Sequence, residues 1–398
     1  MTRTVALEKA CEFVTDGTHY TPKNIGVGVP FLTVKDVGDR AIDLAGCSFI
    51  SEADYLAAKA ANSAPRRGDV LFSKDGTVGK VHVVVTDHPF AVLSSLAILR
   101  PRCEATDAGY LGHALRAPAA IDQALKKKTG SAIRRIVLSD LRQVQIPLPP
   151  LSEQRRIAAI LDQADTLRAK RREALAHLDS LMQSIFFEMF GDPSHSTQSF
   201  PACALDALLA SPLQNGAYYP KENYSDDGIE MVHMSDAFNG IVKRGALKRV
   251  DCSDRDIGKY RLSESDILIA RRSLTYDGAA KPCRVPASSE PLIFESSFIR
   301  ISPDPAKVST EYLFRYLQNE RVREKHVRPF VTQSTISGIN QSNLERVSVI
   351  VPPLDLQHVF ATRIQAVESL NATHRAALAE SDALFASLQH RAFAGQLS

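Results

Sequence analysis

Basic and polar side chains gather in four loops of this 398-residue chain, two in each half. Lys and Arg neutralise phosphate groups, whereas Asn, Gln and Arg hydrogen-bond the edges of bases, so this combination favours nucleic-acid contact. We expect an interface of Lys74, Lys80, Lys127, Lys128, Thr129, Ser131 and Arg134 in the first half, and of Arg271, Arg272, Tyr276, Arg328, Thr332, Gln333, Ser334, Thr335 and Asn340 in the second. Each cluster alone is more simply explained as a solvated surface, but the recurrence in both halves favours a shared function.

The signatures of common DNA-processing enzymes are missing from the sequence. Gly79-Lys80 and Gly258-Lys259 are not followed by Ser or Thr, so neither forms the phosphate-binding loop of an NTPase. No lysine has the acidic residue two positions earlier that one large class of nucleases uses to hold its metal ion. The double prolines at 149–150 and 352–353 lie between Leu or Val residues, outside the motif of amino-methyltransferases. We therefore predict a non-catalytic protein with no catalytic residues, cofactor or metal.

Composition leaves the partner open. The formal charge of +3 is nearly balanced, so any nucleic-acid contact must come from local basic patches. No apolar run approaches the ~20 residues of a membrane span, and the first residues lack an apolar signal core, so we expect a cytoplasmic protein with no membrane contact. The six cysteines are scattered without a CxxC pair, which favours reduced thiols.

The elements that must position the basic loops are duplicated at a period near 200 residues. Pro352, Pro353 and Leu354 repeat Pro149, Pro150 and Leu151, and the segment 230–237 (EMVHMSDA) resembles the segment 30–37 (PFLTVKDV). Each half therefore reads as a mixed α/β unit of about 150 residues followed by a long helix.

The first long helix is predicted over 151–191, with Ser152 as its N-cap and Gly191 at its end. Some 38 helical residues would span roughly 57 Å. Two adjacent stripes of apolar residues, one of which includes Leu167 and Leu181, indicate packing along another helix. The equivalent helix is predicted over 354–398.

Four segments make the chain resemble the specificity (S) subunit of type I restriction-modification systems. They are PLPPLSEQRRIAAILDQADTLRAKRR (147–172), the Phe-rich end of that helix, the loop DGTHYTP (16–22) and the tail that begins TQSTISGIN (332–340). The second copy departs from the motif, because Asp355, Leu356 and His358 replace Ser152, Glu153 and Arg155. By itself, the loop 16–22 is more simply explained as an ordinary turn with an exposed His19 and Tyr20.

The resemblance implies an α+β fold of two target recognition domains held apart by an antiparallel coiled coil of long helices. The boundaries would be 1–150 for the first domain, 151–191 for the central helix, 192–353 for the second domain and 354–398 for the C-terminal helix. Each domain would read one half of a bipartite, asymmetric sequence in double-stranded DNA, and the helix length would set the spacer between the halves.

The resemblance also implies partners. Two methylation subunits would bring S-adenosylmethionine and methylate adenine N6, and restriction subunits with motor and nuclease activity would bring ATP and Mg. The alternative is a coiled-coil adaptor without DNA specificity.

Overall fold

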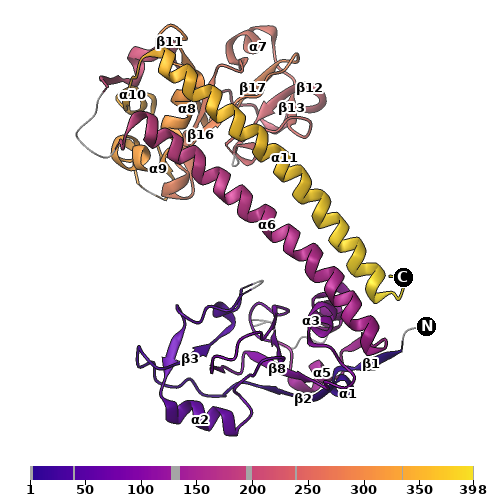
Figure 1. Cartoon of the computed structure of the whole chain (residues 1–398). Helices are drawn as coiled ribbons and strands as arrows, with labels where there is room; N and C mark the ends of the chain where they lie inside the picture. The colour runs from indigo at the N-terminus through magenta and orange to yellow at the C-terminus, as the bar shows by residue number, and fades with distance from the viewer. Residues whose placement is uncertain are drawn as a thin grey trace. The chain divides into compact units, whose positions relative to one another are not determined.

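The computed structural model describes residues 3–38, 41–126, 135–193, 200–237, 240–333 and 335–397 (Figure 1). The chain forms two compact units, residues 1–173 with 375–398 (unit 1) and residues 174–374 (unit 2). Each long helix is divided between the units, so each unit contains one globular α/β part and a segment of both helices.

Unit 1 is built on an antiparallel sheet of strand order β2-β8-β5-β6, a smaller sheet of order β4-β3-β7 and the pair β1-β9. Its elements are β1 (Thr4–Ala6), α1 (Leu7–Ala10), β2 (Cys11–Asp16), β3 (Val29–Leu32), η1 (Val34–Asp36), β4 (Ser48–Ile50), α2 (Glu52–Ala60), β5 (Val70–Ser73), β6 (Val81–Val83), β7 (Ala91–Val92), β8 (Leu96–Pro101), α3 (Ala108–Arg116), α4 (Pro118–Lys126), α5 (Leu138–Arg142) and β9 (Gln145–Pro147).

Unit 2 repeats this topology with sheets of order β11-β18-β14-β16 and β13-β12-β17 and the pair β10-β20. Its elements are β10 (Ala202–Ala204), η2 (Leu205–Leu208), β11 (Leu209–Asn215), η3 (Lys221–Asn223), β12 (Tyr224–Val232), η4 (Met234–Asp236), β13 (Lys248–Val250), α7 (Asp254–Tyr260), β14 (Ile267–Ala270), β15 (Arg272–Ser273), η5 (Tyr276–Gly278), β16 (Pro282–Arg284), β17 (Leu292–Phe294), β18 (Phe298–Pro303), α8 (Thr310–Gln318), α9 (Glu320–Val322), η6 (Arg323–Val327), η7 (Arg328–Phe330), β19 (Ser337–Gly338), α10 (Gln341–Glu345) and β20 (Ser348–Ile350). The duplication and the α+β class predicted from the sequence are confirmed.

In each larger sheet, one of the two inner strands is buried on both faces. In β5, Val70 and Phe72 pack in the core that contains α3, whereas Leu71 packs in the core that contains the smaller sheet. In β14, Ile267 and Leu268 divide between two cores in the same way. Burial on both faces explains why these strands read as continuous apolar runs rather than alternating ones.

The long helices are α6 (Leu151–Phe190) and α11 (Leu354–Phe393), 40 residues each, or about 60 Å. They pack in opposite directions. In unit 1, Arg168 of α6 pairs with Asp382 of α11 at 2.5 Å, and in unit 2 Asn371 of α11 donates to Asp179 of α6 at 3.3 Å. The predicted antiparallel pairing is therefore confirmed.

Two details of the helix prediction are wrong. Ser152 lies inside the first turn, because the carbonyl of Pro150 already accepts from the amides of Glu153 and Gln154. Leu167 and Leu181 are 55% and 44% exposed. The inward face instead crosses between the two predicted stripes and follows Ile157, Leu161, Ala164, Arg168, Arg171, Leu175, Leu178, Met182, Ile185 and Met189.

A buried glutamine joins each long helix to its globular part. Gln154 accepts from the amide of Asp107 and donates to the carbonyls of Ala105 and Pro149, at 2.8–2.9 Å. Gln357 accepts from the Ser309 amide at 2.8 Å and donates to a proline carbonyl at 2.7 Å. Both side chains are fully buried, so this residue of the repeated motif has a structural role that is the same in both units.

Candidate nucleic-acid interface

In unit 2 the two predicted clusters of that half lie side by side beyond the end of strand β14. Strand β15 pairs antiparallel with β19, in the register Arg272 to Gly338 and Ser273 to Ser337. The amide of Ile339 donates to the carbonyl of Arg271 at 3.0 Å. Segments that are more than sixty residues apart in the sequence are thus joined by backbone hydrogen bonds.

The same site contains two further segments. The Arg271 amide donates to the Ser297 carbonyl at 2.8 Å, and the Ser296 amide donates to the Ala217 carbonyl at 2.8 Å. The turn before β18 and the loop after β11 therefore border the basic cluster. Tyr218, in this loop, is 81% exposed.

Unit 1 has an equivalent arrangement. The Lys74 amide donates to the Ser95 carbonyl, the Ser94 amide to the Thr18 carbonyl and the Ile136 amide to the Lys74 carbonyl, each at 2.9 Å. The pair β15-β19 has its counterpart in a single bridge between Asp75 and Arg135, whose side chains also form an ion pair at 3.2 Å.

The loop after the first strand of each larger sheet depends on a glycine at matching places, Gly17 and Gly216. A Cβ at Gly17 would lie 2.0 Å from the carbonyl oxygen of Val92, and one at Gly216 would lie 2.2 Å from that of Glu295. Only glycine permits this close approach. The DGTHYTP loop, which we interpreted as an ordinary turn, is therefore part of the same site, with Tyr20 52% exposed.

The charge at the equivalent basic residue differs between the units. In unit 1, Lys74 is 1% exposed and its Nζ lies 2.7 Å from a carboxylate oxygen of Asp16. In unit 2, Arg271 occupies the place of Lys74, since each follows the last residue of the matching strands β14 and β5. Asn215 occupies the place of Asp16, since Asp16 pairs with Ala97 and Asn215 pairs with Ile299 in matching strands. The Arg271 side chain is partly exposed and makes a 3.4 Å contact with the Ser296 carbonyl. The charge of Lys74 is thus compensated by Asp16, whereas no carboxylate among the described residues forms an ion pair with Arg271.

Several predicted residues have internal partners. Lys80 donates to the carbonyls of Val34 and Val37 at 3.3 and 2.7 Å, which holds η1 against the loop after β5. Asn340 caps α10 by accepting from the Asn343 amide at 2.8 Å.

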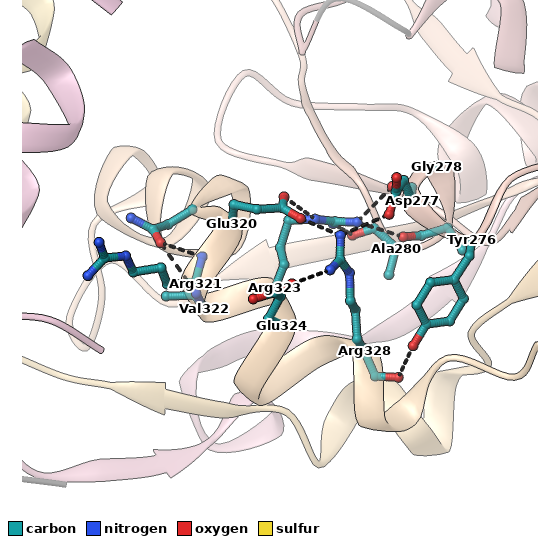
Figure 2. A network of polar contacts seen from close by, with 12 residues as sticks. Tyr276, Asp277, Gly278, Ala280, Glu320, Arg321, Val322, Arg323, Glu324 and Arg328 are labelled. Atoms are coloured by element: carbon teal, nitrogen blue, oxygen red, sulfur yellow. Dashed lines mark hydrogen bonds and ion pairs between the residues drawn. The ribbon is translucent and has the colours of Figure 1, made fainter. Parts of the chain in front are cut away.

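Two residues of the unit 2 cluster, Tyr276 and Arg328, belong to a network of arginines and carboxylates (Figure 2). Arg328 forms ion pairs with Asp277, Glu320 and Glu324, and its carbonyl accepts from the Tyr276 hydroxyl at 3.1 Å. The Arg328 side chain is only 18% exposed, so its positive charge is compensated by carboxylates of its own unit.

The remaining predicted residues divide into two groups. Arg272, Thr332, Gln333 and Thr335 are exposed, as is the capping residue Asn340 described above. Lys127, Lys128, Thr129, Ser131, Arg134 and Ser334 lie outside the described residues.

Sequence reasoning missed the environments of three residues of the unit 2 site. Leu274, at the tip beyond β15, is 86% exposed, and Ile336, which precedes the paired Ser337, is 51% exposed. Arg323, by contrast, is buried behind the tip. No local pattern marks these residues, because their environments depend on the β15-β19 pairing.

Comparison with known proteins identifies the family. A family model described as the type I restriction modification DNA specificity domain matches residues 12–177 and again residues 210–380. The chain belongs to this family. The resemblance inferred from the LSEQRR motif is confirmed, and an adaptor without DNA specificity is not supported.

Two curated relatives are specificity subunits. The chain is 22% identical over 305 residues to the type I restriction enzyme StySPI specificity subunit of Salmonella potsdam, which covers 73% of this chain and 65% of the relative. It is also 22% identical over 321 residues to the type I restriction enzyme EcoKI specificity subunit of Escherichia coli K12, which covers 76% and 68%. The matched region thus spans about two thirds of each of these relatives.

A solved structure shares the fold. The type I restriction-modification system S subunit from M. genitalium is 13% identical, with a TM-score of 0.57 over 99% of this chain and 96% of that one. In the part of the chain that the structure describes, no helix is long and apolar enough to cross a membrane.

Proposed function

We propose that this chain is the DNA sequence-recognition subunit of a type I restriction-modification complex. Each unit would read one half of a bipartite target in double-stranded DNA, and partner subunits would methylate adenine N6 or restrict unmodified DNA. The observation that carries the proposal is that one four-segment site occurs in both units with different side chains, Lys74 and Asp16 in one and Arg271 and Asn215 in the other. Different side chains at one site would read different half-sites, so the target would be asymmetric.

Direct contact is proposed for the exposed residues of unit 2. Arg271 would neutralise a phosphate, Arg272 would hydrogen-bond a base edge, and Thr332, Gln333 and Thr335 would contact bases or sugar-phosphate groups. Lys74 and Arg328 are left out of direct contact, because Asp16 in one case and three carboxylates in the other already compensate their charges. Asn340 and Lys80 would support the loops, and the predicted residues outside the described ranges remain candidates in unit 1.

The long helices offer two equivalent surfaces for partners. Four exposed leucines of α6 and α11 form two repeat-related pairs with an offset of 203 residues, Leu167 with Leu370 and Leu181 with Leu384. The duplication of these exposed leucines would suit two methylation subunits, one for each repeat. Those subunits and the restriction subunits would carry S-adenosylmethionine, ATP and Mg, and the complex would act in the cytoplasm.

A map of N6-methyladenine across the genome tests the proposal, with this gene intact, deleted, and complemented by variants. Deletion should abolish methylation of one bipartite, asymmetric motif. Complementation with Arg272→Ala should reduce methylation of that motif, whereas Arg255→Ala, which removes another exposed arginine of unit 2 on α7, should restore it. An unchanged map in a cell whose partner subunits are active would refute the proposal.

A further inference from the structure

The loop that carries Arg272 and Tyr276 has a counterpart in unit 1 with the same backbone hydrogen bonds. In unit 2 the Ala270 amide donates to the Lys281 carbonyl at 2.9 Å, and the Ala280 amide donates to the Ala270 carbonyl at 2.8 Å. In unit 1 the Ser73 amide donates to the Lys80 carbonyl at 2.9 Å, and the Gly79 amide donates to the Ser73 carbonyl at 3.0 Å. Ala280 therefore occupies the position of Gly79.

Both positions have a left-handed backbone, but only one is a glycine. The φ angle is +99° at Gly79 and +57° at Ala280. Glycine adopts this region without steric cost, whereas alanine does so rarely and must be held there by its surroundings. Among the non-glycine residues that the structure describes, Asn62 is the other with a positive φ, and Asn tolerates that conformation better than Ala.

Arg323 holds the unit 2 loop from inside the unit. Its guanidinium donates to the carbonyls of Ala280, Asp277 and Ala279 at 2.8, 2.9 and 3.0 Å. Figure 2 shows the side chain reaching from the helical segment to this loop. The side chain is 2% exposed, and Arg323 begins a stretch of π-helix, a rare conformation that is frequent at functional sites.

Unit 1 uses a different residue at the same place. A Cβ at Gly79 would lie 2.8 Å from the Cδ1 atom of Ile121. Ile121 is the repeat counterpart of Arg323, since the helices that contain or precede them, α4 and α9, begin at the matching residues Pro118 and Glu320. The Ile121 side chain has no hydrogen-bond donor. Gly79 needs no such donor to hold its backbone, because glycine adopts a positive φ without steric cost. The two units thus pair glycine with isoleucine and alanine with arginine.

We propose that Arg323 is a positioning residue for DNA recognition by unit 2, which fixes the 271–281 loop by binding three of its carbonyls and so holds Ala280 in the left-handed conformation. Through this loop it sets the place of Arg272, which is proposed to contact DNA. This inference rests on the proposed function of the interface.

A double-mutant cycle tests the proposal in the assembled complex. In it, Arg323 and Ala280 are replaced, singly and together, by their unit 1 counterparts Ile and Gly. Discrimination is the affinity for a duplex that contains the motif identified by the genome map, divided by the affinity for a duplex with a single base changed. It is measured separately for changes in each half-site of the motif. Arg323→Ile should lower discrimination about tenfold in one half-site, the same half that is affected by Arg272→Ala, because one base contact is misplaced. Discrimination in the other half-site should not change.

The double variant Ala280→Gly with Arg323→Ile recreates the unit 1 pair. It should recover discrimination to within about threefold of the unsubstituted complex, although it lacks the buried arginine. Ala280→Gly alone should change little, because Arg323 still binds the loop. Arg321→Ile is the matched control: Arg321 lies two residues earlier, pairs with Asp192 and stacks on Phe187, and its contacts among the described residues do not include the loop.

Hydrogen exchange of the 271–281 amides gives a readout that does not need DNA. Exchange should be faster in Arg323→Ile and slow again in the double variant. If the unsubstituted complex shows no specific DNA binding, the proposed function fails. Hydrogen exchange still tests whether Arg323 fixes the 271–281 loop.

Three outcomes would overturn the inference: full discrimination by a folded Arg323→Ile protein, a double variant no better than the single one, or an equal loss of discrimination in Arg321→Ile. If Arg323→Ile does not fold, the double variant decides. A double variant that also fails to fold would show that Arg323 serves the core of unit 2 and not the loop.

Discussion

Replacing Asn215 by Asp should cancel the positive charge of the unit 2 interface. The substitution recreates the environment of unit 1, where Asp16 lies 2.7 Å from Lys74. A carboxylate at the equivalent place would form an ion pair with Arg271 and remove it from phosphate contact. Loss of one charge-assisted contact is worth about 1.5–3 kcal/mol, or roughly ten- to a hundredfold in affinity. The slope of log K against log salt concentration should become shallower by about 0.9, the value for one phosphate.

Fluorescence anisotropy of the complex on its target duplex, at a series of salt concentrations, measures both quantities. Asn62→Asp is the matched control, because it places the same added charge on an exposed residue of unit 1. Thermal unfolding should show no loss of stability for Asn215→Asp, since the new ion pair lies within the unit. The reasoning is refuted if affinity and salt slope are unchanged, or if Asn62→Asp reduces them equally.

Three further predictions concern the scaffold. Gln154→Leu removes three hydrogen bonds of a buried side chain and Gln357→Leu removes two. We therefore expect the local free energy of unfolding to fall by about 3 kcal/mol in unit 1 and about 2 kcal/mol in unit 2, measured by hydrogen exchange. Losses below about 1 kcal/mol would contradict this expectation. Burial lowers the pKa of His326, so the unfolded state binds a proton at this residue before the folded state does, and the free energy of unfolding should decline as pH falls through about 6.5. His326→Phe keeps a ring against Tyr316 and should make denaturant unfolding less pH-dependent between pH 7 and 5. An unchanged pH dependence would argue against a role for His326. A seven-residue insertion in the middle of each long helix adds about 10 Å, so under the proposed function the methylated motif should keep both half-sites and gain about three base pairs of spacer; sequencing that shows an altered half-site would count against helices that only set the spacing.

The sequence by itself determined the features that depend on local pattern. Proline pairs before Leu151 and Leu354 and long runs without Gly or Pro predict two long helices, and the structure has them over 151–190 and 354–393. Helix formation depends on residues within one or two turns, so these local signals predict where the two helices lie, although the cap at Ser152 and the buried face were predicted wrongly. The duplication was equally visible, because the two copies keep matching residues at a nearly constant offset.

The tertiary structure alone decided which side chains are available at the interface. Lys74 reads as a basic residue at a strand end, yet Asp16, nearly sixty residues earlier, buries and neutralises it. Arg323 reads as one more charge on a polar helix, yet it binds three carbonyls of a loop some forty residues away. The free energy of a charged side chain depends on burial and on its nearest partners in space. Strand pairing brings those partners together from distant parts of the chain, and no local spacing rule contains them.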